Sequence, residues 1–230
     1  MANKKIWAGV IVGLTLCAGS AQAVPNYVQN GSFEDGLNNW AISGGGAYPV
    51  SVIVTDGSTG SAFGEAVPAD NAAGPSPDAA GTHGAYFVDD IAHQTLTQTI
   101  HLLAGNYEIG FDAYAPLNGF NNQFDAYFSG TIASVTLASY SVHGQNDPQA
   151  WLHYQGFANV LAEGDYIVTF DFQPQGAPAS DVVVDKVYII ASDQGGGTPI
   201  GDVPEPLTLS LVGAGLAGMG AMRRRKARKA

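Results

Sequence analysis

Two ten-residue stretches in the middle of the chain repeat one pattern of turn and strand residues. GNYEIGFDAY at 105–114 and GDYIVTFDFQ at 164–173 share glycine, tyrosine, phenylalanine and aspartate at equal spacing. The matching pairs are Gly105 and Gly164, Tyr107 and Tyr166, Phe111 and Phe170, and Asp112 and Asp171. Because successive strand side chains point to opposite faces, the tyrosine and the phenylalanine of each stretch fall on one face.

An alternating run precedes each stretch, LTQTIHLLA before the first and YQGFANVLAE before the second. With glycine supplying the turn, each run and stretch together are predicted to form a β-hairpin. Two similar hairpins suggest related positions in the two sheets of a sandwich. Convergence on common turn chemistry is the alternative explanation of the repeat.

The rest of the central region also predicts strands. Short apolar or alternating runs recur between glycine, asparagine, aspartate and proline, without a long helical period, which is typical of an all-β sandwich. The predicted strands are 27–33, 50–55, 85–88, 95–102, 107–114, 132–140, 152–160, 166–172 and 182–190. They are rich in the branched and aromatic side chains that pack well on a pleated sheet.

The first 23 residues have the three-part layout of a secretory signal peptide. A short basic start is followed by a mostly apolar run over 6–20 and then by Ala21-Gln22-Ala23, small residues suited to signal peptidase. Cys17 is the single cysteine, and the large Leu16 before it argues against lipoprotein acylation. We therefore expect export through the Sec machinery and a mature chain without disulfides, stabilised by its core or by a metal.

Basic residues are almost absent from the region between the two ends. Of nine lysines and arginines, two fall in the signal peptide and six in the last eight residues, which leaves Lys186. All 20 acidic residues lie from Glu34 to Glu205, so this region carries a net charge of −19. Such a charge excludes nucleic acid and anionic lipid as partners and favours bound cations such as calcium. Solubility of an exported protein is the plainer explanation.

The chain closes on VPEPLTLSLVGAGLAGMGAMRRRKARKA, residues 203–230. The uncharged run 207–222 would form a helix of about 24 Å, slightly short of a hydrocarbon core of about 30 Å. Snorkelling basic residues and local thinning can absorb the mismatch. The basic tail favours a cytoplasmic C-terminus, which agrees with a signal peptide that places the acidic body on the far side of the inner membrane.

The order Pro204-Glu205-Pro206, hydrophobic span and basic cluster with Arg223, Arg224 and Arg225 resembles the PEP-CTERM sorting signal of Gram-negative bacteria. The resemblance implies transient insertion in the inner membrane and processing by an exosortase near the Pro-Glu-Pro. It also implies delivery to the cell surface or the medium in an organism that makes exopolysaccharide or biofilm. An ordinary single-pass anchor is the alternative. The predicted layout is signal peptide 1–23, sandwich 24–194, linker 195–202 and sorting signal 203–230.

The central region resembles the jelly-roll, galactose-binding-like sandwiches used as carbohydrate-binding modules. VQNGSFEDGLNNW at 28–40, the repeated stretches and DVVVDKVYII at 181–190 are the parts that match. The resemblance implies a structural calcium ion held by Glu34 in the opening motif and Asp185 in the closing one. Solvated carboxylates at both positions are the plainer alternative. Many such domains bind sugar and others are spacers, so the fold alone does not decide function.

Sugar recognition needs a flat aromatic face together with amides and carboxylates that bond hydroxyl groups. The predicted carbohydrate-binding residues are Trp151, Tyr154, Tyr114 and Tyr127, with Asn121, Asn122 and Gln123 in the polar segment PLNGFNNQFDAY. Trp40 is predicted to fill the core instead. Trp151 begins a strand, and either a rim or a buried position fits it. The long Gly/Ala/Pro/Ser loop 56–84 is predicted to be disordered or an irregular flap.

Nothing in the sequence has the spacing of a known catalytic motif. The histidines near DDIAH at 89–93 lack a recognised metal-ligand spacing, and no serine lies in a G-x-S-x-G elbow. Twenty carboxylates make acidic pairs unavoidable, so no pair is evidence for glycoside hydrolysis. Three hypotheses follow: a non-catalytic sandwich that binds extracellular polysaccharide, a structural or adhesive surface protein without a sugar site, and a matrix-modifying enzyme.

Overall fold

The computed structural model describes residues 24–58, 63–144 and 149–192, and within them nearly all regular structure is β. The predicted signal peptide, the linker and the whole sorting signal lie outside the described residues. No helix within the described ranges is long and apolar enough to cross a membrane.

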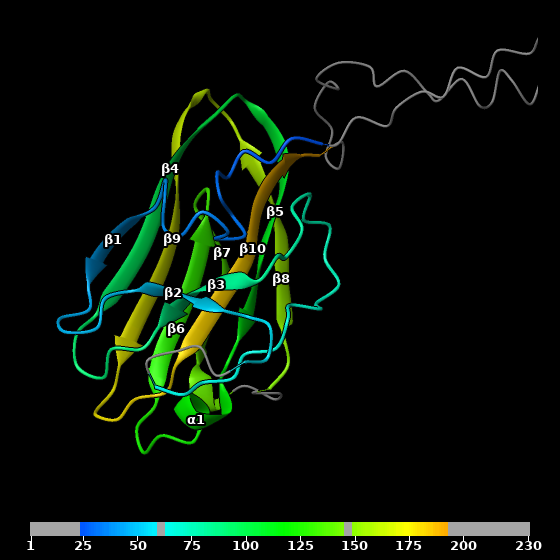
Figure 1. Cartoon of the computed structure of the whole chain (residues 1–230). Helices are drawn as coiled ribbons and strands as arrows, with labels where there is room; N and C mark the ends of the chain where they lie inside the picture. Colours follow the sequence, from blue (N-terminus) through cyan, green and yellow to red (C-terminus); the bar gives the residue numbers. More distant parts are fainter. Residues whose placement is uncertain (1–23, 59–62, 145–148, 193–230) are drawn as a thin grey trace, which may run out of the picture. The chain divides into compact units, whose positions relative to one another are not determined.

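In the part of the chain that the structure describes, ten strands form two five-stranded antiparallel sheets (Figure 1). Sheet A has the order β1 (Ala41–Gly44), β4 (Gln94–Leu102), β9 (Gly164–Pro174), β6 (Ala126–Ile132) and β7 (Val135–Ser141). Sheet B has the order β2 (Ser51–Val54), β3 (His83–Phe87), β10 (Val182–Ala191), β5 (Gly105–Tyr114) and β8 (Leu152–Val160). A short helix α1 (Leu117–Phe120) and a 3-10 turn (Val142–Gly144) lie in the connections.

The strand order identifies the sandwich as a jelly roll. Strands β3 to β10 alternate between the sheets except at β6 and β7, which are neighbours in sheet A. Their orders are 4-9-6-7 and 3-10-5-8, while β1 and β2 extend one edge of each sheet. Eight strands in two four-stranded sheets with this interleaving are the jelly-roll arrangement. The predicted fold class, an all-β jelly-roll sandwich, is confirmed.

The prediction that each repeated stretch closes a hairpin is wrong. Strand β4 pairs with β9 and strand β5 pairs with β8, so each short turn carries the chain from one sheet to the other. The repeated tyrosines stabilise these crossings, because Tyr107 and Tyr166 each donate to the carbonyl oxygen four residues earlier, both at 2.9 Å. Two strands joined by a turn that crosses between sheets show the same alternation of apolar and polar residues as a hairpin. The two repeated units, β4–β5 and β8–β9, do occupy related positions in the two sheets.

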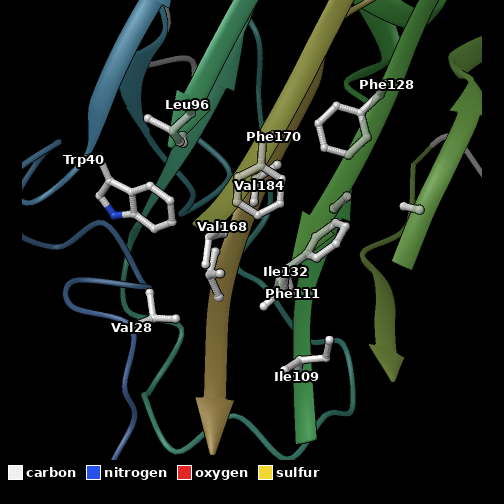
Figure 2. Close-up of a cluster of buried hydrophobic side chains, with 14 of the residues drawn as sticks. Val28, Trp40, Leu96, Ile109, Phe111, Phe128, Ile132, Val168, Phe170 and Val184 are labelled. Carbon is white, nitrogen blue, oxygen red and sulfur yellow. The ribbon is translucent and has the colours of Figure 1, made fainter. Parts of the chain in front are cut away.

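The repeated phenylalanines meet in the core between the sheets. Phe111 and Phe170 are fully buried, and their rings pack edge to face with centroids 4.9 Å apart. Trp40 is buried against Phe170, as predicted for a core residue. Figure 2 shows these rings with Phe128 among aliphatic side chains from both sheets. The repeat therefore builds the centre of the core from both layers.

Two parts of the strand prediction need correction. Residues 27–33 form turns instead of a strand, because Asn30 and Phe33 adopt positive φ angles of 52° and 57° that no extended strand allows. The predicted strand 132–140 spans the end of β6, a two-residue turn with positive φ at Ala133 and Ser134, and most of β7. Strands β1 and β6 were not predicted.

Candidate functional site

The outer face of sheet A is an open, polar surface, which we call the hydroxyl face. The alternating burial of β4, β9, β6 and β7 leaves one set of side chains outside the core. The hydroxyl face consists of Thr95, Thr97, Thr99, Ile167, Thr169, Asp171, Gln173, Tyr127, Ser129, Thr131, Thr136, Ser139 and Ser141. Most side chains of this face carry hydroxyl groups. Threonine is favoured on half-exposed strands, and serine is a polar residue suited to the solvent side.

Strand register arranges these side chains in rows across the sheet. One row runs through Thr97, Thr169, Thr131 and Thr136, and the next through Thr95, Asp171, Ser129 and Ser139. Neighbouring strands lie about 4.8 Å apart, so each row is a ladder of closely spaced donors and acceptors. In the third row Gln173 faces Tyr127, which faces Ser141.

Tyr127 gives the hydroxyl face an accessible aromatic ring. The residue is 39% exposed, and its hydroxyl group bonds the Ser139 hydroxyl group on the neighbouring strand. The apolar side chain of Ile167 is 52% exposed on β9. A ring, an aliphatic patch and rows of hydroxyl groups together can contact both the apolar and the polar sides of a sugar.

Carboxylate–histidine contacts lie near both ends of β9. At one end Asp171 lies 2.6 Å from His93 Nε2 and accepts a hydrogen bond from Gln173 at 2.9 Å. At the other end His101 lies 3.0 Å from Asp165 and 3.2 Å from Glu163. Hydrogen bonds to Asp165 and Glu163 raise the pKa of His101. All of these side chains are at least partly exposed, so the ion pairs contribute little to the free energy of folding.

The structure does not bring the predicted carbohydrate-binding residues together. Tyr127 is on the hydroxyl face, whereas Asn121, Asn122 and Gln123 follow helix α1 in a loop, where Asn122 donates to the Ala179 carbonyl. Tyr154 is partly buried and stacks on Phe111 and Tyr140. Sequence reasoning missed the threonines and serines, although their alternation with apolar residues was the available signal.

The prediction that Tyr114 and Trp151 face a ligand is wrong, because both rings are buried. Tyr114 is 4% and Trp151 is 6% exposed, and the two rings pack 5.3 Å apart. Trp151 Nε1 donates to the Pro68 carbonyl at 2.9 Å. Of the two positions that fitted Trp151, the buried one is correct.

The residues that bury these rings belong to a flap, residues 63–82, which covers part of the outer face of sheet B. Val67 of the flap is fully buried in a second hydrophobic cluster with Ile53, Tyr86, Tyr114, Trp151 and Val183. Glu65 accepts a hydrogen bond from the Gly119 backbone at 3.0 Å and joins the flap to helix α1. Of the two alternatives predicted for this loop, the irregular flap describes these residues.

Beneath the flap lies a buried ionic network around Lys186. Its ammonium group is 2.9 Å from Asp112 Oδ2, 3.6 Å from Asp70 Oδ2 of the flap, and 2.8 Å from the Ala72 carbonyl to which it donates. Asp112 also contacts His153 Nδ1 at 2.5 Å. A register shift in β10 between Asp185 and Tyr188 and a φ of 49° at Lys186 set the lysine's position. The one lysine of the acidic region therefore fastens the flap to sheet B.

Several carboxyl groups around the flap have strongly raised pKa values. Burial raises the pKa of Asp185 to about 9, and the nearby Asp70 and Asp112 add to the shift. Burial raises the pKa of Asp70 to about 7, and the hydrogen bond that its protonated form donates to the Asp112 carboxylate adds to the shift. Burial also raises the pKa of Asp181 to about 7, with added repulsion from Glu65. The ordinary value is 3.8 in each case.

These shifts predict that the protein loses stability as the pH rises. A carboxyl group whose pKa is higher in the folded state takes up a proton on folding, so its contribution is full below about pH 4 and is lost through pH 7 to 9. We expect the melting temperature to fall between pH 5 and pH 9, and Asp185→Asn to flatten the fall above pH 7. Differential scanning calorimetry of both proteins checks this, and parallel curves would contradict it.

The two residues predicted to hold calcium have different surroundings. Glu34 Oε1 accepts from the backbone N–H groups of Thr82 and His83 at 2.7 and 2.8 Å, whereas Asp185 is buried and accepts from the Lys186 N–H at 2.6 Å. Among the described residues, no group of three or more histidine, cysteine, aspartate or glutamate side chains could hold a metal ion. Calcium at Glu34 and Asp185 stays a prediction.

A serine, a histidine and an aspartate meet near helix α1 but are not arranged for nucleophilic catalysis. His143 Nε2 lies 3.0 Å from Ser180 Oγ and 2.9 Å from the Phe120 carbonyl, and Nδ1 lies 4.0 Å from Asp125. Because a carbonyl oxygen only accepts, Nε2 carries the proton and cannot act as the base for Ser180. Ser180 is also fully buried. The trio therefore fastens α1 to the turn at 142–144.

Solved structures similar to this chain include several carbohydrate-binding modules. TmCBM61, solved in complex with beta-1,4-galactotriose, has 20% identity and a TM-score of 0.47 over 73% of this chain and 99% of its own. Family 16 Carbohydrate Binding Module-2 has 16% identity and a TM-score of 0.41 over 72% and 99%. A Stig cyclase from Fischerella sp. TAU has 17% identity and a TM-score of 0.45 over 74% and 98%. No curated protein matches the chain.

Similarity of sequence is found at the C-terminal end. Residues 202–226 match the PEP-CTERM protein-sorting motif, within which lie Pro204, Glu205, Pro206 and Arg223 to Arg225. The chain thus combines a jelly-roll sandwich with a PEP-CTERM protein-sorting motif.

Proposed function

We propose that this is an exported, non-catalytic protein that binds extracellular polysaccharide through the hydroxyl face of sheet A. The observation that carries the proposal is the open set of hydroxyl rows beside the exposed ring of Tyr127 and the side chain of Ile167. Sugar hydroxyl groups both donate and accept, as do the threonine and serine side chains of this face. A sugar ring also has apolar C–H surfaces that pack on a tyrosine ring.

The flap supports assigning the site to sheet A. On sheet B, flap residues 63–82 cover part of the equivalent outer surface and bury Tyr86, Tyr114 and Trp151, while Phe157 of β8 stays 53% exposed. On sheet A, the four strands β4, β9, β6 and β7 offer their outward side chains to an extended chain. An open face of this kind suits a polymer lying across several strands better than a small ligand, which needs a concave pocket.

The variant Tyr127→Ala tests the site. Loss of the ring is expected to weaken retention on the organism's own exopolysaccharide about tenfold, which corresponds to about 1.4 kcal/mol. Tyr127→Phe keeps the ring and is expected to retain most of the binding. Affinity electrophoresis in gels containing the polysaccharide gives the measurement.

The control variant is Tyr48→Ala, which removes a tyrosine that is 51% exposed in a loop and packs against Phe63. It is expected to migrate like the parent protein. If Tyr48→Ala and Tyr127→Ala lower retention equally, the binding site is elsewhere. If the parent is not retained at all, the alternative of a structural or adhesive protein without a sugar site is favoured.

The destination is proposed from the sorting motif and the predicted signal peptide. After export through the Sec machinery and signal peptidase cleavage, the protein would reach the surface or biofilm matrix of a Gram-negative bacterium. Removing the exosortase is expected to leave a chain that retains residues beyond Glu205 in the inner membrane. Mass spectrometry of the C-terminal peptide in both strains checks this, and identical C-termini would contradict it.

A further inference from the structure

We infer that the polysaccharide taken by the hydroxyl face is cationic, a polymer of amino sugars with free amino groups. This inference rests on the proposed function and adds the charge class of the ligand. The inference follows from the scarcity of positive charge on the described surface and from the positions of the carboxylates along β9.

The surface offers almost no fixed positive charge. Within the described residues the one lysine or arginine is Lys186, whose side chain is 11% exposed and lies beside Asp112 under the flap. Polymers that carry carboxylate, sulfate or phosphate groups need ammonium or guanidinium partners, which form the strong charge-assisted hydrogen bonds. The described surface would repel such a polymer instead of binding it.

Carboxylates stand at both ends of the outward side of β9. Asp165 and Asp171 point to the same side of the strand and are separated by six residues, about 20 Å. The Asp165 side chain is 71% exposed, that of Glu163 beside it is 64% exposed, and that of Asp171 is 24% exposed. An ammonium group of the ligand can therefore reach a carboxylate at each end of the strand.

The side chains between the two carboxylates suit the rest of an amino sugar. Ile167, which is 52% exposed, can pack against ring C–H groups, and Thr169 lies between Thr97 and Thr131 in a hydroxyl row. The order carboxylate, apolar side chain, hydroxyl group, carboxylate along β9 matches a polymer that carries amines, apolar ring surfaces and hydroxyl groups. His93 and His101 also contact Asp171 and Asp165, so an ammonium group of the ligand would bind each carboxylate beside an imidazole ring.

The test compares one polymer in two charge states. Glycol chitosan has free amines, and its N-acetylated form is the neutral control with the same backbone; alginate is the anionic comparison. Affinity electrophoresis of the exported protein is expected to show at least tenfold stronger retention on glycol chitosan than on the N-acetylated form. Raising the salt concentration from 0.05 to 0.5 M is expected to remove most of this difference, because screening weakens exposed charge pairs.

Because an acidic protein attracts any polycation, a matched pair of variants is needed. Asp165→Asn with Asp171→Asn removes two charges from β9, and Asp35→Asn with Asp56→Asn removes two exposed charges elsewhere. The first pair is expected to lose most of the preference for the free amines, and the second to keep it. Both pairs should melt like the parent, which excludes unfolding as the cause.

The outcomes separate the two proposals. Equal losses in the two variant pairs, or retention on the N-acetylated polymer as strong as on glycol chitosan, would overturn the inference. Stronger retention on alginate would overturn it as well. In each of these cases polysaccharide binding itself would stand, provided that Tyr127→Ala weakens it. Absence of retention on all three polymers and on the native exopolysaccharide would overturn the proposed function too.

Discussion

Lys186→Met is expected to lower the free energy of unfolding by about 3–5 kcal/mol at pH 8, because it leaves buried carboxylates without their cation. Asp112 is fully buried, and the Asp70 carboxylate of the flap is also inaccessible. Methionine roughly preserves the volume of the lysine stem, so the loss reports mainly on charge. The measurement is urea-induced unfolding followed by circular dichroism.

The effect of Lys186→Met should be smaller at pH 5. The pKa of Asp70 is about 7, so at lower pH this group is neutral and needs no cation. Adding Asp112→Asn to Lys186→Met should recover part of the loss, because the uncompensated charge is removed. A loss below 1 kcal/mol at pH 8 would show that the network contributes little and that the flap is held by its hydrophobic cluster.

Phe170→Ala is expected to cost about 3–5 kcal/mol of unfolding free energy through the lost burial and the cavity it leaves. Phe170 has no exposed surface and packs against Phe111, Phe128 and Trp40. The matched control is Ile167→Ala on the same strand, which points outward and should change stability by no more than about 0.5 kcal/mol. Equilibrium unfolding in urea compares the two variants.

The double variant Phe111→Ala with Phe170→Ala adds a test of the repeat. Because the two rings are in contact, their removal should be non-additive, with a coupling of about 0.5–3 kcal/mol. Strict additivity would contradict the view that the repeated phenylalanines form one unit of the core. Similar losses for Phe170→Ala and Ile167→Ala would contradict the assignment of the buried face of β9.

The all-β class and the core rings were predictable because they depend on local alternation. The period of two places Phe111 and Phe170 on inward faces without any knowledge of partners. Which strand pairs with which is not local: one alternation fits both a hairpin and a crossing between sheets, and only the full set of contacts selects β4 with β9 and β5 with β8.

The candidate site was harder to predict, because the prediction relied on aromatic residues and the sequence does not show which of them are buried. Tyr114 and Trp151 look like ligand platforms in the sequence, but the flap buries them through Val67 and the Pro68 carbonyl. The flap is rich in glycine, alanine and proline, and its packing depends on residues far away in the chain, including Lys186. Only Tyr127 keeps its predicted role as an accessible aromatic ring.

Strand β10 is the final strand of the sandwich in the chain, yet it occupies the middle of sheet B between β3 and β5. Until residues 182–191 are available for pairing, β3 and β5 each present an unpaired edge, which is a template for aggregation. Assembly must therefore wait for nearly the whole domain, and long-range pairing of this kind is slow. A polypeptide truncated before residue 182 should accumulate as insoluble material.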